Sequence, residues 1–282
     1  MNPVLRIPLG TGTLELGVYS TFYLLAWACC PLVAAVVARR GGAPFARALG
    51  VYAGAMAAGV IGARIFDLGI AGRFYAEDPS RVWSLQFQGF SLYGGLLVAA
   101  LTAIGLAQFT RLDRWPLADA AVPALVLGVA LMRTGCFLRG CCFGVECALP
   151  WGVVFPLGSP AWELQVASGR LGLLSALGGA AAMPVHPTQL YEIAAAVILG
   201  GAAWVLARRG APRGVPFLAF AFGFTAFRLL NGYLRARQQV ITAPVWFYPV
   251  FYAVVLAILA VLIARRYHAA RAQAQEALAR YP

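Results

Sequence analysis

Seven long apolar runs restrict this chain to folds in which most of the backbone lies inside a membrane. The runs cover about residues 16–37, 49–70, 90–109, 118–135, 189–206, 215–233 and 245–264. A helix of about 20 apolar residues crosses the hydrocarbon core of a bilayer and satisfies its own backbone hydrogen bonds there. Only 11% of the residues are charged, well below the share in soluble domains. The pattern therefore predicts an all-α membrane protein with seven transmembrane helices, organised as a single domain over residues 1–282.

Arginine supplies every fixed positive charge, because the sequence contains no lysine, and its placement predicts the orientation of the helices. The formal net charge is +12, and arginines follow the first, third, fifth and seventh apolar runs. Positive residues concentrate on the cytoplasmic side of membrane proteins, so these ends are expected in the cytoplasm. The N-terminus and an extracytoplasmic arm over residues 144–187 are then expected outside. Because the arginines stand singly or in pairs at the ends of apolar runs, the expected partner is a lipid bilayer and not nucleic acid.

Three arginines lie inside the predicted spans, where an ionised side chain costs about 2.5–3.5 kcal/mol and so indicates function. Arg64 has Asp67 on the same helix face, which makes a structural ion pair and a functional role equally good interpretations. Arg133 and Arg228 have no acidic residue at helical spacing. We expect each to bind the phosphate of an anionic headgroup, with snorkelling to the interface as the alternative. Arg235, seven residues after Arg228, is expected on the same helix face.

A cysteine-rich stretch, MRTGCFLRGCCFG over residues 132–144, follows the fourth run at the predicted outer boundary. With the next cysteine along the chain it forms the pattern C-x4-CC-x4-C, made by Cys136, Cys141, Cys142 and Cys147. This spacing is not typical of zinc or iron–sulfur sites, and no histidine lies close by, so no metal site is predicted. Tight packing and a disulfide are the favoured interpretations. A thiolate nucleophile activated by Arg133 or Arg139 is the third.

Two further polar stretches are candidate walls of a site at the same level. HPTQLYE opens the fifth run and supplies His186, Gln189, Tyr191 and Glu192. Tyr93-Gly94-Gly95 opens the third run, where the glycines allow close backbone approach beside a phenol. A tyrosine could act as a base only if nearby cations lowered its pKa of about 10. A lone histidine at a helix start is more often structural than catalytic, so both roles stay open for His186.

With these motifs in order, the chain resembles the prolipoprotein diacylglyceryl transferase family almost from end to end. The stretches that carry the resemblance are Gly17-Val18-Tyr19, Gly62-Ala63-Arg64, Asp78-Pro79, residues 89–95 (GFSLYGG), residues 133–137 (RTGCF), residues 186–192 (HPTQLYE), and Arg228 with Arg235. HPTQLYE is the most specific single match. Seven spans with the N-terminus outside also agree with the family.

The sequence departs from the family around the cysteine-rich stretch. The family signature resembles G-R-x-G-N-F-x-N-x-E-x-x-G, of which this chain keeps Arg133, Gly135, Phe137 and Gly144. Cys136 and Arg139 stand where asparagine is usual, and Cys141 stands in place of the glutamate. Tyr93 replaces a histidine, and Gly232 replaces an acidic residue. The arginines of the family are therefore kept, whereas the polar groups around its reacting centre are exchanged.

The resemblance implies a transferase that moves the diacylglyceryl group of phosphatidylglycerol onto the lipobox cysteine thiol of a preprolipoprotein at the bacterial inner membrane. Its partners would be phosphatidylglycerol, preprolipoprotein signal peptides and the bilayer, with no metal or organic cofactor. Arg133 and Arg228 would clamp the departing phosphate, and Tyr93 or His186 would take the thiol proton. The implied substrate-binding residues are Tyr19, Arg64, Gly94, Gly95, Arg139, Gly144, Gln189, Tyr191, Glu192 and Arg235.

Two other classes of function stay open on the residues alone. A membrane thiol–disulfide oxidoreductase would use the cluster Cys136/Cys141/Cys142/Cys147 as its redox group. A non-catalytic paralogue would keep the fold and bind lipid without transferring any part of it.

Overall fold

The computed structural model describes residues 4–9, 12–80, 92–172, 178–179, 181–236 and 244–280, with residues 4–9, 12–16, 73–74, 92–93 and 278–280 described by their backbone alone. The chain forms two compact units. The first contains residues 1–28, 127–196 and 230–237, and the second contains residues 29–126, 197–229 and 238–282. The cysteine-rich stretch and HPTQLYE belong to the first unit, whereas Arg64, Tyr93 and Arg228 belong to the second. The single-domain organisation stays a prediction.

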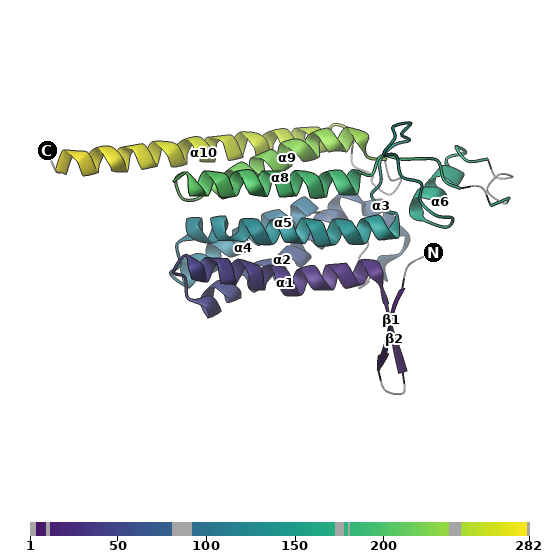
Figure 1. Cartoon of the computed structure of the whole chain (residues 1–282), viewed down its shortest axis with the longest axis horizontal. Coiled ribbons are helices and arrows are strands. Elements are labelled where there is room, and N and C mark those ends of the chain that lie inside the picture. The colour runs from purple at the N-terminus through teal and green to yellow at the C-terminus, as the bar shows by residue number, and fades with distance from the viewer. Residues whose placement is uncertain are drawn as a thin grey trace. The chain divides into compact units, whose positions relative to one another are not determined.

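Long helices account for most of the described chain, as the apolar runs predict (Figure 1). They are α1 (Val18–Arg40), α2 (Phe45–Ile70), α4 (Leu92–Phe109), α5 (Arg114–Arg139), α8 (Thr188–Arg208), α9 (Val215–Leu234) and α10 (Phe247–Arg280). All of these except α4 are long and apolar enough to cross a membrane, which makes six candidate spans among the described residues. In α4 the corresponding apolar stretch is shorter, Gly94–Phe109. The chain is therefore a helical, multi-pass membrane protein.

The helices present apolar side chains on their outer surface, as contact with lipid requires. On α10 the side chains of Val254, Ile258 and Val261 are each more than 50% exposed. In water a surface of this kind would promote aggregation, whereas hydrocarbon chains cover it in a bilayer. The surface therefore agrees with the membrane class that the composition predicts.

A β-hairpin precedes α1 and is not predicted by the apolar runs. β1 (Val4–Leu9) pairs antiparallel with β2 (Gly12–Gly17), so that Val4 lies opposite Gly17 and Leu9 opposite Gly12. Two short helices, α3 (Gly72–Glu77) and α6 (Pro160–Ala167), are also present. The two strands and two short helices have six to eight residues each, too few to cross a membrane as a helix.

The segment predicted as an arm, residues 144–187, folds around α6 in the first unit. Ser159 caps this helix by accepting a hydrogen bond from the Trp162 backbone N–H at 3.3 Å. Gln165 binds the backbone of Met183 through both ends of its amide, with Nε2 donating at 3.1 Å and Oε1 accepting at 2.7 Å. Phe155, Ala161 and Val185 of this segment form a small buried core together with Phe143, which precedes it. Among its described residues, the segment contains no helix of spanning length.

In the second unit, α2 and α4 approach each other through glycines. A Cβ added at Gly62 would lie 2.4 Å from the Val98 Cβ, and one added at Gly94 would lie 2.1 Å from the Phe66 Cβ. A Cβ added at Gly95 would lie 3.0 Å from the Gly59 carbonyl oxygen and 3.2 Å from the Ala63 Cβ, which is a tight contact. The distances at Gly62 and Gly94 leave no room for a side chain, so small residues let the two backbones pack directly, as is common for helices in membranes.

Replacing Gly94 by alanine should therefore push α2 and α4 apart. The added methyl group overlaps Phe66, and overpacking of this kind costs about 1–3 kcal/mol of unfolding free energy. Gly105→Ala is the matched control on the same helix, since a Cβ there meets nothing within 4 Å. Unfolding of the purified variants in detergent measures both effects. An unfolding midpoint for Gly94→Ala equal to that of the control would contradict the close packing.

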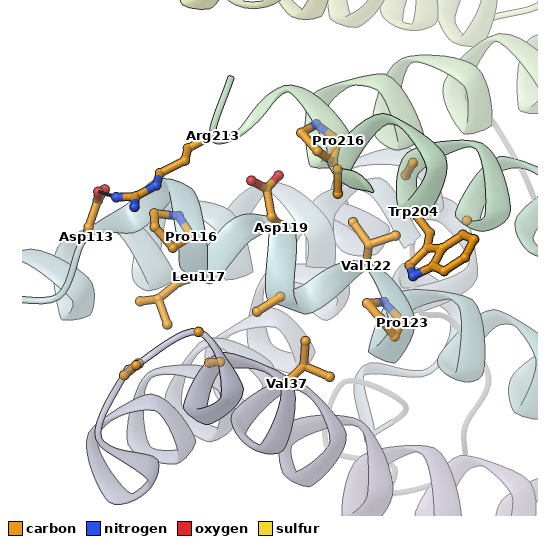
Figure 2. Close-up of a pocket in the computed structure, with 18 of the residues that line it drawn as sticks. Val37, Asp113, Pro116, Leu117, Asp119, Val122, Pro123, Trp204, Arg213 and Pro216 are labelled. Carbon is orange, nitrogen blue, oxygen red and sulfur yellow. Dashed lines mark ion pairs between the residues drawn. The ribbon is translucent and has the colours of Figure 1, made fainter. Parts of the chain in front are cut away.

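A cavity of about 920 Å³ opens in the second unit among α5, α8, α9 and the turn between α1 and α2 (Figure 2). Its walls are mostly apolar, and at its edge Asp113 and Arg213 form an ion pair of 4.0 Å. Asp119 accepts hydrogen bonds from the backbone N–H groups of Gly214 at 2.7 Å and Phe217 at 3.0 Å, near the start of α9. The described lining contains none of the residues that the sequence predicts for the site.

Candidate functional site

One buried carboxylate, that of Glu192 on α8, organises the polar side chains of the first unit. Its Oε2 accepts a hydrogen bond from Arg133 Nε at 2.6 Å, and its Oε1 lies 3.8 Å from Arg235 Nη1. Asn231 Nδ2 also donates to Oε1, at 3.4 Å. The Glu192 side chain is only 2% exposed. Two guanidinium groups thus share one carboxylate, and these three groups together carry an excess of one positive charge.

Arg133 on α5 pairs with Glu192 of the protein itself, a partner that the sequence did not show, and its binding of a ligand phosphate stays a prediction. Glu192 follows 59 residues later, so a search at helical spacing could not show the pair. Because the Arg133 side chain is only 14% exposed, its charge needs a partner at hydrogen-bond distance. Two residues further on, Gly135 brings α5 close to α1, since a Cβ there would lie 3.0 Å from the Phe22 Cβ.

Arg235 lies just beyond the end of α9, and its backbone forms an antiparallel bridge with Gly144. The expectation that Arg228 and Arg235 share one helix face is therefore wrong. The helix ends because the backbone of residues 234–236 hydrogen-bonds with residues 143–145 instead of continuing its own ladder. Arg228 itself is buried on α9 in the second unit, and its action on the same phosphate stays a prediction.

Gly144 lies where three backbone segments of the first unit meet. Its N–H donates to the His186 carbonyl at 2.8 Å. A Cβ at this position would lie 2.5 Å from the His186 Cβ and 2.6 Å from the Leu234 carbonyl oxygen, so a larger residue does not fit. This glycine therefore joins the cysteine-rich stretch to HPTQLYE and to the residue before Arg235.

The cysteine-rich stretch leaves α5 in a tight turn that α8 holds in place. Gly140 and Cys142 have positive φ angles of 73° and 60°, and the second is unusual for a residue with a side chain. Gln189 Nε2 donates to the Cys141 carbonyl at 2.6 Å, and Thr188 Oγ1 donates to the Cys142 carbonyl at 2.7 Å. Both donors come from fully buried side chains. Tertiary hydrogen bonds thus stabilise a backbone conformation that the local sequence disfavours.

This turn brings the sulfur atoms of Cys136, Cys141 and Cys142 within 4.8 Å of one another. Arg133 Nη1 donates to Cys136 Sγ at 3.8 Å. The pKa of the Cys142 thiol lies well below its ordinary value because the other two thiols hydrogen-bond to it, and Arg235 and Arg133 act in the same direction against the effect of burial. The hydrogen bond with Cys136 raises the pKa of Cys141. The three sulfur atoms could hold a metal ion, which the sequence spacing did not indicate.

The cysteines carry free thiols in this structure. The disulfide that the sequence left open is therefore not formed, and packing accounts for Cys147, which is buried outside the group of three sulfur atoms. Three of the four cysteines that the alternative function would use therefore come together, and Cys147 lies outside this group.

His186 is joined to two aromatic residues by consecutive hydrogen bonds. Its Nδ1 lies 3.1 Å from the Tyr191 hydroxyl, which accepts a hydrogen bond from Trp151 Nε1 at 2.8 Å. In the tautomer with the proton on Nδ1, the ring donates to Tyr191 and Nε2 is the basic atom. His186 can therefore serve as a base at Nε2 in that tautomer only.

Arg139, at the end of α5, lies over the ring of Tyr19, with its guanidinium carbon 5.0 Å from the ring centroid. Its Nε is buried without a hydrogen-bond partner among the described residues, and the same holds for Gln189 Oε1 and Asn231 Oδ1. Buried polar atoms normally have partners. These three atoms are therefore candidates for contacts with a bound substrate.

The predicted site residues of the second unit have structural partners there. Arg64 Nη1 donates to the Tyr75 hydroxyl at 3.2 Å, and that hydroxyl donates to Asp67 Oδ2 at 2.6 Å, so Tyr75 mediates the predicted pairing. Burial and the bond to Asp67 raise the pKa of Tyr75. The glycine pair of α4 packs against α2. Tyr93 belongs to α4, but its side chain lies outside the described residues.

Fold and site together define a class: a multi-pass helical membrane protein that holds two partly buried guanidinium groups beside one buried carboxylate and next to a group of thiols. The family model for prolipoprotein diacylglyceryl transferase matches residues 6–270. The chain belongs to this family, as its motifs predict.

Curated proteins similar to this chain share one name, phosphatidylglycerol–prolipoprotein diacylglyceryl transferase. The one from Geobacter sulfurreducens is 31% identical over 166 residues, which are 57% of this chain and 54% of the relative. For that from Nitratidesulfovibrio vulgaris the identity is 31% over 182 residues, 62% of this chain and 59% of the relative. The protein from Proteus mirabilis is 31% identical over 164 residues, which are 57% of this chain and 55% of the relative. The chain thus spans little more than half the length of these relatives.

Proposed function

We propose that this chain transfers the diacylglyceryl group of phosphatidylglycerol to the lipobox cysteine thiol of a preprolipoprotein. Family membership supports the proposal, as do the names of the relatives, which specify phosphatidylglycerol and prolipoprotein. The observation that carries it is the cluster of two partly buried guanidinium groups, those of Arg133 and Arg235, around the buried carboxylate of Glu192. Its excess positive charge suits the phosphate of an anionic lipid, which guanidinium groups bind with good geometry.

Arg133 would make the largest contribution to the chemistry. The acceptor thiol attacks the glyceryl carbon, the carbon–oxygen bond to the phosphate breaks, and negative charge moves onto the departing glycerol phosphate. Glu192 holds Arg133 through Nε, so the terminal nitrogens of the guanidinium keep a fixed direction. Donors positioned in advance stabilise charge where it develops in the transition state. Arg228 would act on the same phosphate, and Arg235 would add to the positive field.

The other predicted residues would bind and orient the substrates. The unpaired Nε of Arg139 suits a phosphate oxygen, and the unpaired oxygens of Gln189 and Asn231 suit the hydroxyl groups of the headgroup glycerol. His186 or Tyr93 would take the proton of the acceptor thiol. The remaining members of the proposed substrate-binding set are Tyr19, Arg64, Gly94, Gly95, Gly144, Tyr191 and Glu192.

We further propose the topology that this reaction requires. α4, apolar over Gly94–Phe109, would be a seventh span, and residues 144–187 would form an arm outside the cytoplasm. The positive-inside rule then puts the N-terminus outside and the C-terminus in the cytoplasm of a bacterial inner membrane. The cysteine-rich stretch, which adjoins the arm in the sequence, would meet preprolipoprotein signal peptides on the outer side of the bilayer.

A reconstituted assay tests the function. Purified protein in lipid nanodiscs is incubated with labelled phosphatidylglycerol and a lipobox peptide, and the expected products are diacylglyceryl peptide and glycerol phosphate in equal amounts. The same peptide with serine in place of its cysteine is the matched control and should stay unmodified. Binding of the lipid with no product would refute the transferase and favour a non-catalytic lipid-binding protein.

A thiol–disulfide oxidoreductase is the second candidate, and the approach of three sulfur atoms within 4.8 Å favours it. Such an enzyme exchanges its own thiols with a disulfide through a mixed disulfide. Incubation with a model disulfide measures this directly, because each turnover releases a free thiol. Release that is no faster than with Cys136→Ser would exclude this function.

A further inference from the structure

The three sulfur atoms of the first unit are the densest group of soft ligands in the described chain. Cys136 is buried in the last turns of α5, and Cys141 and Cys142 follow in the next turn of the chain. Their Sγ atoms lie within 4.8 Å of one another, and the group contains three ligand atoms. The transfer chemistry derived above assigns them no role.

Contacts from other parts of the first unit set the position of these sulfur atoms. The Cys141 N–H donates to the Cys136 carbonyl at 3.0 Å and closes the turn. Gln189 and Thr188, both fully buried, hold the next two carbonyls. Cys142 is kept at a φ of 60°, a conformation that costs free energy and persists only where the surroundings enforce it. The thiols are thus held close together by the fold, as a metal site requires.

The surrounding charge favours an anionic metal–thiolate group. Three thiolates around a divalent cation carry one net negative charge. The cluster of Arg133, Arg235 and Glu192 carries one net positive charge, and Arg133 Nη1 lies 3.8 Å from Cys136 Sγ. The arginines would therefore stabilise the anionic metal–thiolate group, which lowers the cost of holding its charge in a partly buried place.

We propose that Cys136, Cys141 and Cys142 bind a thiophilic divalent cation, Zn²⁺, and leave its fourth coordination position to the acceptor thiol. Zinc–sulfur bonds of about 2.3 Å place tetrahedral sulfur ligands about 3.8 Å apart, so a small contraction of the group suffices. Three protein ligands with one open position are the arrangement of catalytic zinc sites, whereas structural sites have four protein ligands. The proposal rests on the proposed function, because it assigns the open position to the acceptor of that reaction.

Coordination would prepare the acceptor thiol for attack. A thiol that binds the ion loses its proton, here to the proposed base, His186 or Tyr93, and the bound thiolate attacks the glyceryl carbon next to the phosphate ester. A carbon–sulfur bond forms and the carbon–oxygen bond breaks, with its electron pair leaving on glycerol phosphate beside Arg133. The product is an uncharged thioether, a weaker ligand than a thiolate, so it leaves the metal. The step consumes no oxidant or reductant.

The zinc content of the purified full-length protein is the first test. After exposure to Zn²⁺ and dialysis against metal-free buffer, elemental analysis should find about one zinc ion per chain. Cys136→Ser, Cys141→Ser and Cys142→Ser should each lower this content at least about tenfold. Cys147→Ser, which changes a buried cysteine outside the group, is the matched control and should retain the zinc. No zinc in a protein with free thiols would overturn the proposal, as would equal zinc in all variants.

Cobalt substitution tests the open position without any catalytic readout. Co²⁺ bound by thiolates absorbs through charge transfer from sulfur, and a further thiolate strengthens this absorption. The lipobox peptide should strengthen it, and its serine counterpart should not, whereas no response to the cysteine peptide would overturn the activation of the acceptor. A spectral response with no transferred product would support the metal site and refute the proposed function. Full transfer by metal-free protein would refute activation of the acceptor by the metal and support the proposed function.

Discussion

Arg133→Ala should abolish diacylglyceryl transfer while the protein still inserts into the membrane. The change removes the guanidinium that Glu192 positions, and loss of one preorganised charge-stabilising donor lowers turnover by about a hundredfold or more. Transfer to the lipobox peptide in nanodiscs measures the effect, and membrane fractionation of the expressed variant measures insertion. Transfer by Arg133→Ala at the wild-type rate would refute the role of Arg133 in stabilising the departing phosphate.

Two further variants separate this role from general effects of arginine removal. Arg133→Lys keeps the charge but not the fork of donors, so it should recover only part of the lost activity. Arg170→Ala removes an arginine of the same unit that is 68% exposed and pairs with Glu146 at 3.5 Å on the surface. Surface pairs contribute little to stability, so this matched control should transfer at the wild-type rate.

Glu192→Gln should destabilise the protein strongly and also abolish transfer. The change keeps the shape of the side chain but leaves Arg133 and Arg235 without their shared carboxylate. Removing one partner of a buried ion pair costs about 3–5 kcal/mol, because the other charge stays buried and uncompensated. Unfolding of the purified variant by a denaturing detergent measures the loss. Glu163→Gln, which alters an exposed carboxylate on α6, is the matched control and should unfold like the wild type.

A double variant shows how much of the lost stability comes from the broken ion pair and how much from removing the carboxylate itself. Glu192→Gln combined with Arg133→Gln removes both charges, so its loss of stability should be smaller than the sum of the two single losses. The double variant should remain without transfer activity, because the positioned guanidinium is still missing. Strictly additive losses of stability would show that the two side chains are not coupled and would contradict the contact at 2.6 Å.

The long helices could be predicted because their signal is local. Each apolar run corresponds to a helix whose ends agree within a few residues over most of the chain, as with the run at 215–233 and α9, Val215–Leu234. The end of α9 shows that a local signal does not always predict where a helix ends. Periodicity continued the helix to Arg235, but hydrogen bonds to residues 143–145 end it one residue earlier.

The sequence predicted which residues belong to the candidate site better than it predicted which of them contact one another. Residue type and depth in a predicted span singled out Arg133, and HPTQLYE supplied Glu192, but the bond between them joins residues 59 positions apart. The sequence did not single out Asn231, whose amide is part of the cluster. No spacing rule connects side chains that distant.

The cysteines show even more clearly the difference between residues that the sequence reveals and contacts that only the structure reveals. Their pattern matches no metal-binding spacing, because such spacings describe ligands delivered by known local turns. Here the turn depends on Gly140 and on a positive φ at Cys142, and hydrogen bonds from residues 188 and 189 hold it. The convergence of three sulfur atoms could therefore be seen only after the first unit had folded.

Apolar composition was enough to predict a membrane protein and the positions of its long helices, and short motifs such as HPTQLYE were enough to predict its family. The helices follow from the transfer of residues into a bilayer, which depends on each segment almost alone. Tertiary structure alone decided that Glu192 holds Arg133 and Arg235, and that three thiols gather beside them. Buried charges and strained backbone are stable only when distant partners compensate them, so their arrangement is a property of the folded chain.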